Sequence, residues 1–104
     1  MICRIWHGRT TRDNADEYEA FLNMRAVPDY KSVAGNIGVA ILRHDDEVVT
    51  HFLTVTHWEN VSSIRSFAGN DILTAKYYPE DQAYLLEFEP FVQHFIVTAN
   101  EDVA

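Results

Sequence analysis

Four β-rich segments and two helical segments alternate along this chain, and their order is the strongest constraint on its fold. The β-rich segments show alternating apolar positions, whereas the helical segments repeat apolar residues at three- and four-residue spacing. The expected strands are 2–9, 37–43, 47–58 and 89–99, and the expected helices are 15–26 and 60–69. The order βαββαβ predicts an α+β, ferredoxin-like domain whose antiparallel sheet has the spatial order 4-1-3-2, with both helices on one face.

Polar residues, proline and glycine mark the expected ends of these elements. Asp13 is suited to cap the first helix, and Pro28 is expected to end it, because proline disrupts the interior of a helix. Asp45 and Asp46 predict the tip of a hairpin between the second and third strands. Gly69 is expected to end the second helix.

The first and last strands have apolar residues on both sides, which predicts a sheet that is covered on both faces. The helices cover one face, and the sheet of a second subunit is the simplest cover for the other. We therefore expect an obligate homodimer in which two sheets close into a dimeric α/β barrel. Trp6, Phe91 and Phe95 are expected in the dimer interior, where Arg4 would need a carboxylate partner if it were buried.

Length and composition restrict the class of protein. The 104 residues predict one domain, 1–104, and the net charge of −8 argues against nucleic acid or an anionic membrane as a partner. No apolar run is long enough to span a membrane, and the single Cys3 allows no internal disulfide, so a cytoplasmic protein is expected. The four scattered glycines form no phosphate-binding loop.

The chain also resembles a known family. Residues 58–67 read Trp-Glu-Asn-Val-Ser-Ser-Ile-Arg-Ser-Phe, which places a tryptophan at the end of a strand and a phenylalanine late in a short helix. Together with residues 75–90 and the element order, this stretch resembles the dimeric α/β-barrel proteins of the antibiotic biosynthesis monooxygenase family, over roughly residues 2–98. The resemblance implies the fold and the dimer. It does not select one reaction, because the family includes cofactor-independent oxygenases of phenols and haem-degrading enzymes.

The resemblance to the haem-degrading branch is incomplete. That branch uses an asparagine late in the first strand, a tryptophan in the second helix and a histidine after it. The matching positions here are His7, Phe67 and Tyr77, and none keeps the residue of that branch. The resemblance therefore favours a cofactor-independent oxygenase, for which no cofactor and no metal is expected.

Oxygenation without a cofactor requires a general base, a hydrogen-bond donor for the developing anion and a dry aromatic pocket. His7 is the expected base, because the ordinary pKa of histidine, about 6.5, lies near neutral pH. Tyr77 or His94 is the expected orienting donor. The residues expected to bind the substrate are His57, Trp58, Phe67 and Tyr78.

The position of these histidines depends on the directions of the strands. If the first and third strands are parallel neighbours, His7 and His57 lie at one end of the sheet and His51 lies at the other. A metal site built from His7, His57 and His94 can be drawn, but these residues lack the local spacing of a metal motif.

Each candidate also has a structural interpretation. His7 and His57 suit solvent-facing strand ends, and His94 suits a core position with one hydrogen-bond partner. The aromatic candidates suit ordinary packing positions. The leading hypothesis is a cofactor-independent monooxygenase that uses molecular oxygen on a phenolic, quinonoid or other carbonyl-bearing aromatic molecule. The alternatives are a non-catalytic binder of a small hydrophobic ligand and a stress-response dimer with a filled core.

Overall fold

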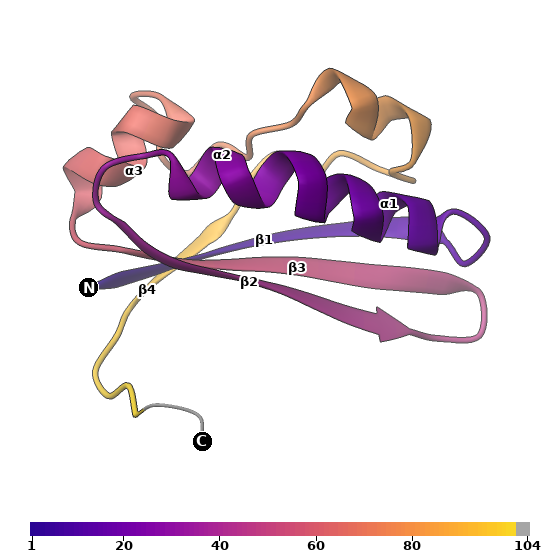
Figure 1. The fold of residues 1–104 in the computed structure, drawn as a ribbon, viewed down its shortest axis with the longest axis horizontal. Helices are drawn as coiled ribbons and strands as arrows, with labels where there is room; N and C mark the ends of the chain where they lie inside the picture. Colours follow the sequence, from indigo (N-terminus) through magenta and orange to yellow (C-terminus); the bar gives the residue numbers. More distant parts are fainter. Residues whose placement is uncertain (102–104) are drawn as a thin grey trace.

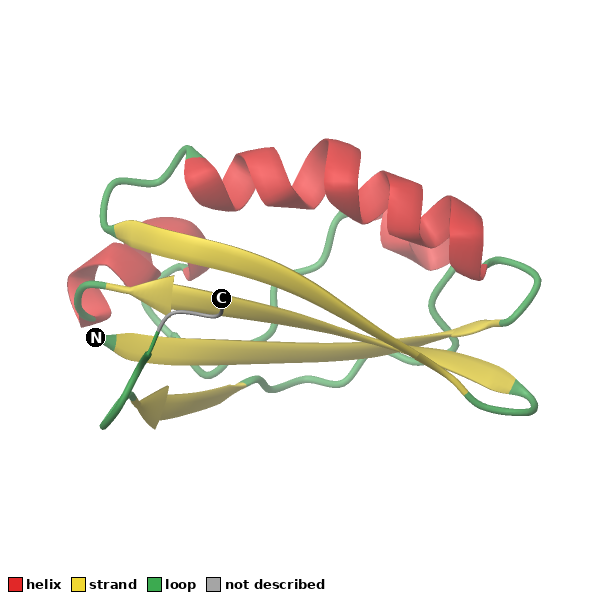
Figure 2. Cartoon of the chain, turned by 60° about the horizontal axis from the view of Figure 1, so that its bottom comes forward, coloured by secondary structure: helices red, strands yellow, loops and turns green. Residues whose placement is uncertain are grey.

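The structure, a computed structural model, describes residues 1–101 and has the predicted ferredoxin-like architecture (Figure 1). Its elements are β1 (Ile2–Thr11), α1 (Ala15–Phe21), η1 (Leu22–Ala26), α2 (Val27–Lys31), β2 (Asn36–Asp45), β3 (Val49–Trp58), α3 (Val61–Ala68), η2 (Pro79–Ala83) and β4 (Gln93–Ile96). The sheet order is β2-β3-β1-β4 and every pairing is antiparallel, which confirms the predicted order 4-1-3-2. Figure 2 shows the helices on one side of the sheet and the other side without a helix among the described residues.

The first helical segment is longer than expected, and the prediction that Pro28 ends it is wrong. α1, η1 and α2 follow one another without a break from Ala15 to Lys31, and η1 is a π-helical stretch of five residues. Pro28 lies at the junction of η1 and α2, where its missing backbone N–H costs the continuous helical segment one hydrogen bond without ending it. The wider π-helical turn before it gives the proline ring room.

The core lies between this helical segment and the sheet. Tyr18, Leu22, Ala26 and Tyr30 recur every four residues and are all buried, so they form one stripe that faces the sheet. β3 alternates strictly, with its even-numbered residues buried and its odd-numbered residues partly exposed. β1 alternates in the same phase beyond its first two residues.

This alternation corrects the expected position of two β1 residues. Trp6 is 5% exposed and belongs to the core beside the helices, not to a dimer interior. Arg4 shares that face and has no carboxylate partner among the described residues, because its guanidinium donates to the carbonyl oxygens of Ile72 and Thr74. Burial lowers the pKa of Arg4.

The registers of the strands also correct the expected positions of the histidines. β1 and β3 run antiparallel, since the α1–α2 connection makes β2 run in the direction of β1 and the hairpin then reverses β3. His57 therefore pairs with Cys3 at the far end of β1, while His51 pairs with Arg9 close to His7. The prediction that His7 and His57 share one end of the sheet is wrong.

The third and fourth strands are shorter than expected. β3 begins at Val49, because Asp46 Oδ1 accepts the backbone N–H groups of Val48 and Val49 and holds the preceding residues in a turn. β4 spans only Gln93–Ile96 and pairs with the first half of β1. Beside the second half of β1 the chain runs without a continuous ladder, held by bonds such as that from the Leu86 N–H to the Arg9 carbonyl oxygen.

One face of the sheet carries no other element among the described residues, and we call it the open face. Its side chains come from alternate positions of all four strands. The large apolar ones are Ile5, Leu42, Leu53, Val55 and Phe95. Leu42 is 47% exposed and Phe95 is 50% exposed, so this face holds apolar surface that the single chain leaves in water.

No described helix is both long enough and apolar enough to cross a membrane.

Gly35, in the loop before β2, is required by its backbone and by its surroundings. Its φ of +90° is a conformation that other residues rarely adopt, and a Cβ placed there would lie 1.9 Å from Ser63 Oγ. Gly69 has a similar φ of +94°, but a Cβ there would meet nothing within 4 Å.

We therefore expect Gly35→Ala to lower the free energy of unfolding more than Gly69→Ala does. The backbone strain common to both changes costs about 1–3 kcal/mol, and the clash with Ser63 adds roughly 1–3 kcal/mol for Gly35→Ala alone. Chemical denaturation of both variants measures this difference. Equal losses would contradict the close approach of Gly35 to α3.

Candidate functional site

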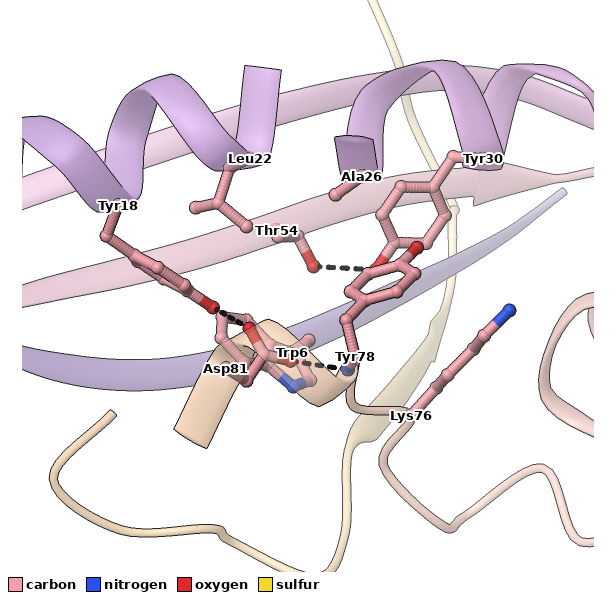
Figure 3. A pocket seen from close by; sticks show the side chains of 9 residues that line it. All are labelled: Trp6, Tyr18, Leu22, Ala26, Tyr30, Thr54, Lys76, Tyr78 and Asp81. Atoms are coloured by element: carbon pink, nitrogen blue, oxygen red, sulfur yellow. Dashed lines mark hydrogen bonds between the residues drawn. The ribbon is translucent and has the colours of Figure 1, made fainter. Parts of the chain in front are cut away.

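A small cavity lies between the helical segment, the sheet and the irregular chain that follows α3 (Figure 3). Its volume is about 10 Å³, which is the room of one water molecule. It is lined by Trp6, Tyr18, Leu22, Ala26, Tyr30, Thr54, Lys76, Tyr78 and Asp81. We call this set the helix–sheet pocket. Its lining combines aromatic rings with hydroxyl, carboxyl and amino groups.

Asp81 is the central polar group of the pocket. It is 2% exposed, and its carboxylate accepts a hydrogen bond from the Tyr18 hydroxyl at 2.8 Å and another from the Tyr78 backbone N–H at 2.6 Å (Figure 3). The residue lies in η2, which Pro79 opens directly after Tyr78. Burial raises the pKa of Asp81, although these two hydrogen bonds act to lower it.

Trp6 contributes a hydrogen-bond donor with no acceptor among the described residues. Its Nε1 is buried and makes no hydrogen bond. The indole of Trp58, which is also buried, donates to Thr56 Oγ1 at 2.8 Å. Buried donors are normally paired, and a polar neighbour of Trp6 is the Tyr77 hydroxyl, whose pKa is raised by burial although Trp6 acts to lower it. An acceptor that enters the pocket would compete with this hydroxyl for the Trp6 N–H.

Two further tyrosines complete the polar lining. Tyr30 lies 3.2 Å from Thr54 through the two hydroxyl groups. The Tyr78 hydroxyl donates to Asp29 Oδ2 at 2.5 Å, and Lys76 Nζ lies 3.3 Å from the same oxygen. The pKa of Tyr78 is raised by burial and by its hydrogen bond to Asp29. These contacts between α2 and residues 76–78 close the rim of the pocket.

Of the three residues expected to act in catalysis, the structure places His7 and Tyr77 beside one neighbour, Glu89, and His94 apart from them. His7 projects from the open face, on the other side of the sheet from the pocket, and its Nδ1 lies 2.5 Å from Glu89 Oε2. The Tyr77 hydroxyl donates to the backbone carbonyl oxygen of Glu89 at 2.5 Å, so Glu89 joins His7 and Tyr77 beside β1. His94 lies opposite Arg4 on β4, with its Nε2 3.0 Å from the Arg4 guanidinium. Burial, with the nearby Arg4 charge, lowers the pKa of His94.

Only one of the four residues expected to bind substrate lines the pocket. That residue is Tyr78. Phe67 stacks on Tyr30 with ring centroids 4.5 Å apart, outside the pocket lining, and Trp58 is completely buried in the core. His57 faces away from the helices on β3. The predicted set therefore does not gather at one site.

Several pocket residues were not predicted from the sequence. Tyr18 and Tyr30 could have been found from the four-residue repeat that continues through Pro28. Asp81 follows Tyr78 by three residues, with its carboxylate on the Tyr78 backbone N–H, a local spacing typical of a helix cap. The contact of Asp81 with Tyr18 spans 63 residues and has no local signal.

Comparison with known proteins gives matches only among solved structures. No family model matches the chain, and no curated protein matches it. A Bacillus cereus protein provisionally described as an antibiotic biosynthesis monooxygenase is similar over 98% of this chain and 97% of its own, with a TM-score of 0.64 and 9% identity. The chain has the fold of the antibiotic biosynthesis monooxygenases.

A second similar structure has a bound porphyrin. It is a point mutant of MhuD with two manganese protoporphyrin IX molecules bound per active site, similar over 99% of this chain and all of its own, with a TM-score of 0.63 and 15% identity. The residues of the helix–sheet pocket do not fit a porphyrin. The volume of the pocket is about 10 Å³, no histidine lines it, and the rings of Trp6, Tyr30 and Tyr78 form much of its wall.

The raised pKa of Asp81 predicts a distinct pH dependence of stability. Asp81 is protonated in both the folded and the unfolded state well below its ordinary pKa of 3.8. As the pH rises through 3.8 towards the higher folded pKa, the unfolded state loses its proton first, so stability falls across that window. Asp81→Asn keeps an acceptor for Tyr78 and can donate to the Tyr18 hydroxyl, but it has no carboxyl to ionise.

We expect the free energy of unfolding of the native chain to fall relative to that of Asp81→Asn as the pH rises through this window, and the difference to be constant above it. Asp81→Ala should lose roughly 2–5 kcal/mol at all these pH values, because it leaves two buried donors unpaired. Urea denaturation at a series of pH values measures both effects. A difference that grows in the opposite direction would show that the folded carboxyl has a lowered pKa.

Proposed function

We propose that the chain is a monooxygenase-type enzyme that acts, without a metal or organic cofactor, on a small phenolic, quinonoid or other carbonyl-bearing aromatic molecule in the helix–sheet pocket. One observation carries this proposal: a buried carboxyl with a raised pKa lines the same small aromatic pocket as the unpaired N–H of Trp6. Ionisable groups with shifted pKa values gather at active sites, where a general base must hold and release a proton. The likeness of fold supports the class of protein and not the substrate.

The chemistry divides between these two side chains. Asp81 takes a proton from the substrate, and Trp6 Nε1–H donates a hydrogen bond to the oxygen on which negative charge develops. The anion then supplies the electrons that reduce molecular oxygen. In the oxidation of a phenol to a quinone, one oxygen atom enters the product and the other leaves as water with two hydrogens from the substrate.

The pocket must open before a substrate enters, because its present volume holds only one water molecule. Tyr78 is the side chain best placed to move, since it lines the pocket at its rim. Its hydroxyl donates to Asp29 and the Arg25 guanidinium lies 4.7 Å from its ring centroid, and these contacts would have to break when it moves. A single-ring phenol needs about the space that the Tyr78 ring occupies. We therefore favour small substrates over fused polycyclic ones.

We expect the chain to consume oxygen when a reactive single-ring phenol or hydroquinone is supplied, and Asp81→Asn to lower kcat by about 10²–10⁴-fold, the usual contribution of a general base. Trp6→Phe should lower kcat through loss of the N–H while keeping an aromatic ring in place. An oxygen electrode, with the uncatalysed oxidation subtracted, gives both rates. Circular dichroism confirms that the variants are folded.

Two results would contradict this assignment. Loss of turnover in His7→Gln with full turnover in Asp81→Asn would place the base on the open face. Binding of the phenols without any oxygen consumption would favour the alternative function, a non-catalytic pocket for small aromatic molecules.

We also propose that the active form is a homodimer whose two open faces pack together. This proposal is supported by the apolar side chains that these faces leave in water, including Leu42 and Phe95. Leu53 lies in the middle of this surface on β3, paired with His7 on one side and Leu42 on the other. A second copy would remove this surface from water.

We expect light scattering to give twice the 12.0 kDa mass of one chain, and Leu53→Asp to shift the protein to the monomer by burying an unpaired charge in the interface. Met24→Asp is the matched control, because Met24 is 81% exposed on the helical side and its substitution should leave the dimer intact. A monomeric native chain, or a dimer that Met24→Asp disrupts and Leu53→Asp does not, would contradict the proposed interface.

A further inference from the structure

Two histidines from neighbouring strands meet on the open face. His7 of β1 and His51 of β3 lie with His7 Nε2 3.0 Å from His51 Nδ1, and their ring planes differ by 23° with centroids 5.2 Å apart. In the single chain their side chains are 30% and 34% exposed, and in the proposed dimer the pair would lie at the interface between the two open faces. They border an open hollow of about 340 Å³ that Leu42, His44 and Leu53 also line.

A carboxylate holds the remaining nitrogen of each ring. Glu89 Oε2 lies 2.5 Å from His7 Nδ1, and Asp46 Oδ2 lies 3.3 Å from His51 Nε2. When each neutral imidazole carries its one N–H on the outer nitrogen and donates it in a hydrogen bond to the carboxylate, both inner nitrogens carry a lone pair and no proton. The chain of four side chains thus places two electron-pair donors face to face.

This is the arrangement that surrounds histidine ligands of metal ions. A ligating histidine usually donates its other N–H to a carboxylate or carbonyl group, which fixes the orientation of the ring and makes the ligating nitrogen more basic. Two nitrogens bound to a tetrahedral zinc ion at about 2.0–2.1 Å lie about 3.3–3.4 Å apart, close to the separation seen here. A small movement of the two rings therefore makes room for an ion between the two lone pairs.

We propose that His7 Nε2 and His51 Nδ1 bind one divalent transition-metal ion of the zinc class, with Glu89 and Asp46 as the outer partners that orient the two rings. Imidazole nitrogen suits zinc, copper and nickel better than magnesium or calcium. No group of three or more ligating side chains is arranged for a metal among residues 1–101, so water completes the coordination.

The neighbouring cations do not oppose the ion strongly. Arg43 also lines the hollow, but its guanidinium contacts the carboxylates of Asp45 and Asp16. Arg9, which pairs with His51 across the sheet, has its Nε 2.5 Å from Glu87 Oε1. Each positive charge therefore already has an acidic partner.

The proposal is independent of the helix–sheet pocket, since the histidine pair lies on the other face of the sheet. Its test is the titration of the full chain, free of any histidine tag, with Zn²⁺ alone. The background is Cys3→Ser, because Cys3 faces His57 on the open face and its thiol would compete for zinc. Calorimetry gives the stoichiometry, and the nitrogen chemical shifts of the imidazole rings identify the ligands.

We expect one Zn²⁺ per chain and large shifts of the His7 and His51 ring nitrogens. His7→Gln and His51→Gln should each weaken binding at least tenfold, and Glu89→Gln should weaken it about 10–100-fold, the usual effect of losing an outer carboxylate. His57→Gln is the matched control, a partly exposed histidine at the other end of the same face, and it should leave the affinity unchanged.

Three results would overturn the proposal. The first is an absence of saturable Zn²⁺ binding. The second is a change in the nitrogen chemical shifts of other histidines, but not of this pair, in the native chain. The third is a Zn²⁺ affinity that His57→Gln lowers as much as His7→Gln does. The ring shifts of the native sequence decide the question even if a variant fails to fold.

Discussion

The carboxylate of Asp81 connects the irregular chain that follows α3 to the first helix, and among the described residues no sheet ladder or helix joins these two parts. It accepts a hydrogen bond from Tyr18 on α1 and another from the backbone of Tyr78, so it ties the chain after α3 to the first helix. Most of residues 69–92 lie outside helices and strands, and they contribute one wall of the helix–sheet pocket. Without this buried carboxylate, the wall would lose its link to α1 and keep the contacts of Tyr78 and Lys76 with Asp29 of α2.

The same interaction explains how the pocket can be stable and still hold the base that we propose. A buried carboxyl resists ionisation, which raises its pKa, yet its two hydrogen bonds keep it fixed in position. Trp6 leaves its indole N–H without a hydrogen bond in the part of the chain that the structure describes, and a buried unpaired donor lowers stability. A phenylalanine at this position would fill similar space without an unpaired donor. We infer that these costs to stability are retained because the pocket has a chemical role.

The two faces of the sheet divide the properties of the protein. Alternate residues of β1 and β3 point towards the helices and away from them, so Trp6 belongs to the pocket while its neighbour His7 belongs to the open face. The helical side is nearly closed, and the open face carries apolar surface and the His7–His51 pair. The proposed enzyme site can therefore be altered separately from the open face, where the proposed dimer interface and metal site share Leu53 and its neighbours.

The order of the elements, the strand order of the sheet and the position of α3 could be predicted from the sequence, because they depend on local periodicity and on simple rules of connection. The direction in which Trp6 points could not, since the start of β1 is apolar on both sides. The meeting of His7 with His51 required the antiparallel register of β1 and β3. The continuation of the helical segment through Pro28 was not predicted either, because it depends on the π-helical stretch before the proline, and the sequence gives no signal for that stretch. Asp81 was missed because its contact with Tyr18 joins residues far apart in the sequence.

The central claim is that a small phenol binds in the helix–sheet pocket next to Trp6 Nε1 and Asp81. The chain has two tryptophans, and only the indole N–H of Trp58 already has an acceptor, so the two indole signals in a ¹H–¹⁵N spectrum form an internal comparison. Titration with a single-ring phenol should move the Trp6 indole signal strongly and the Trp58 signal little. If neither signal moves at saturating phenol, or if the shifts gather on the open face, the helix–sheet pocket is not the functional site.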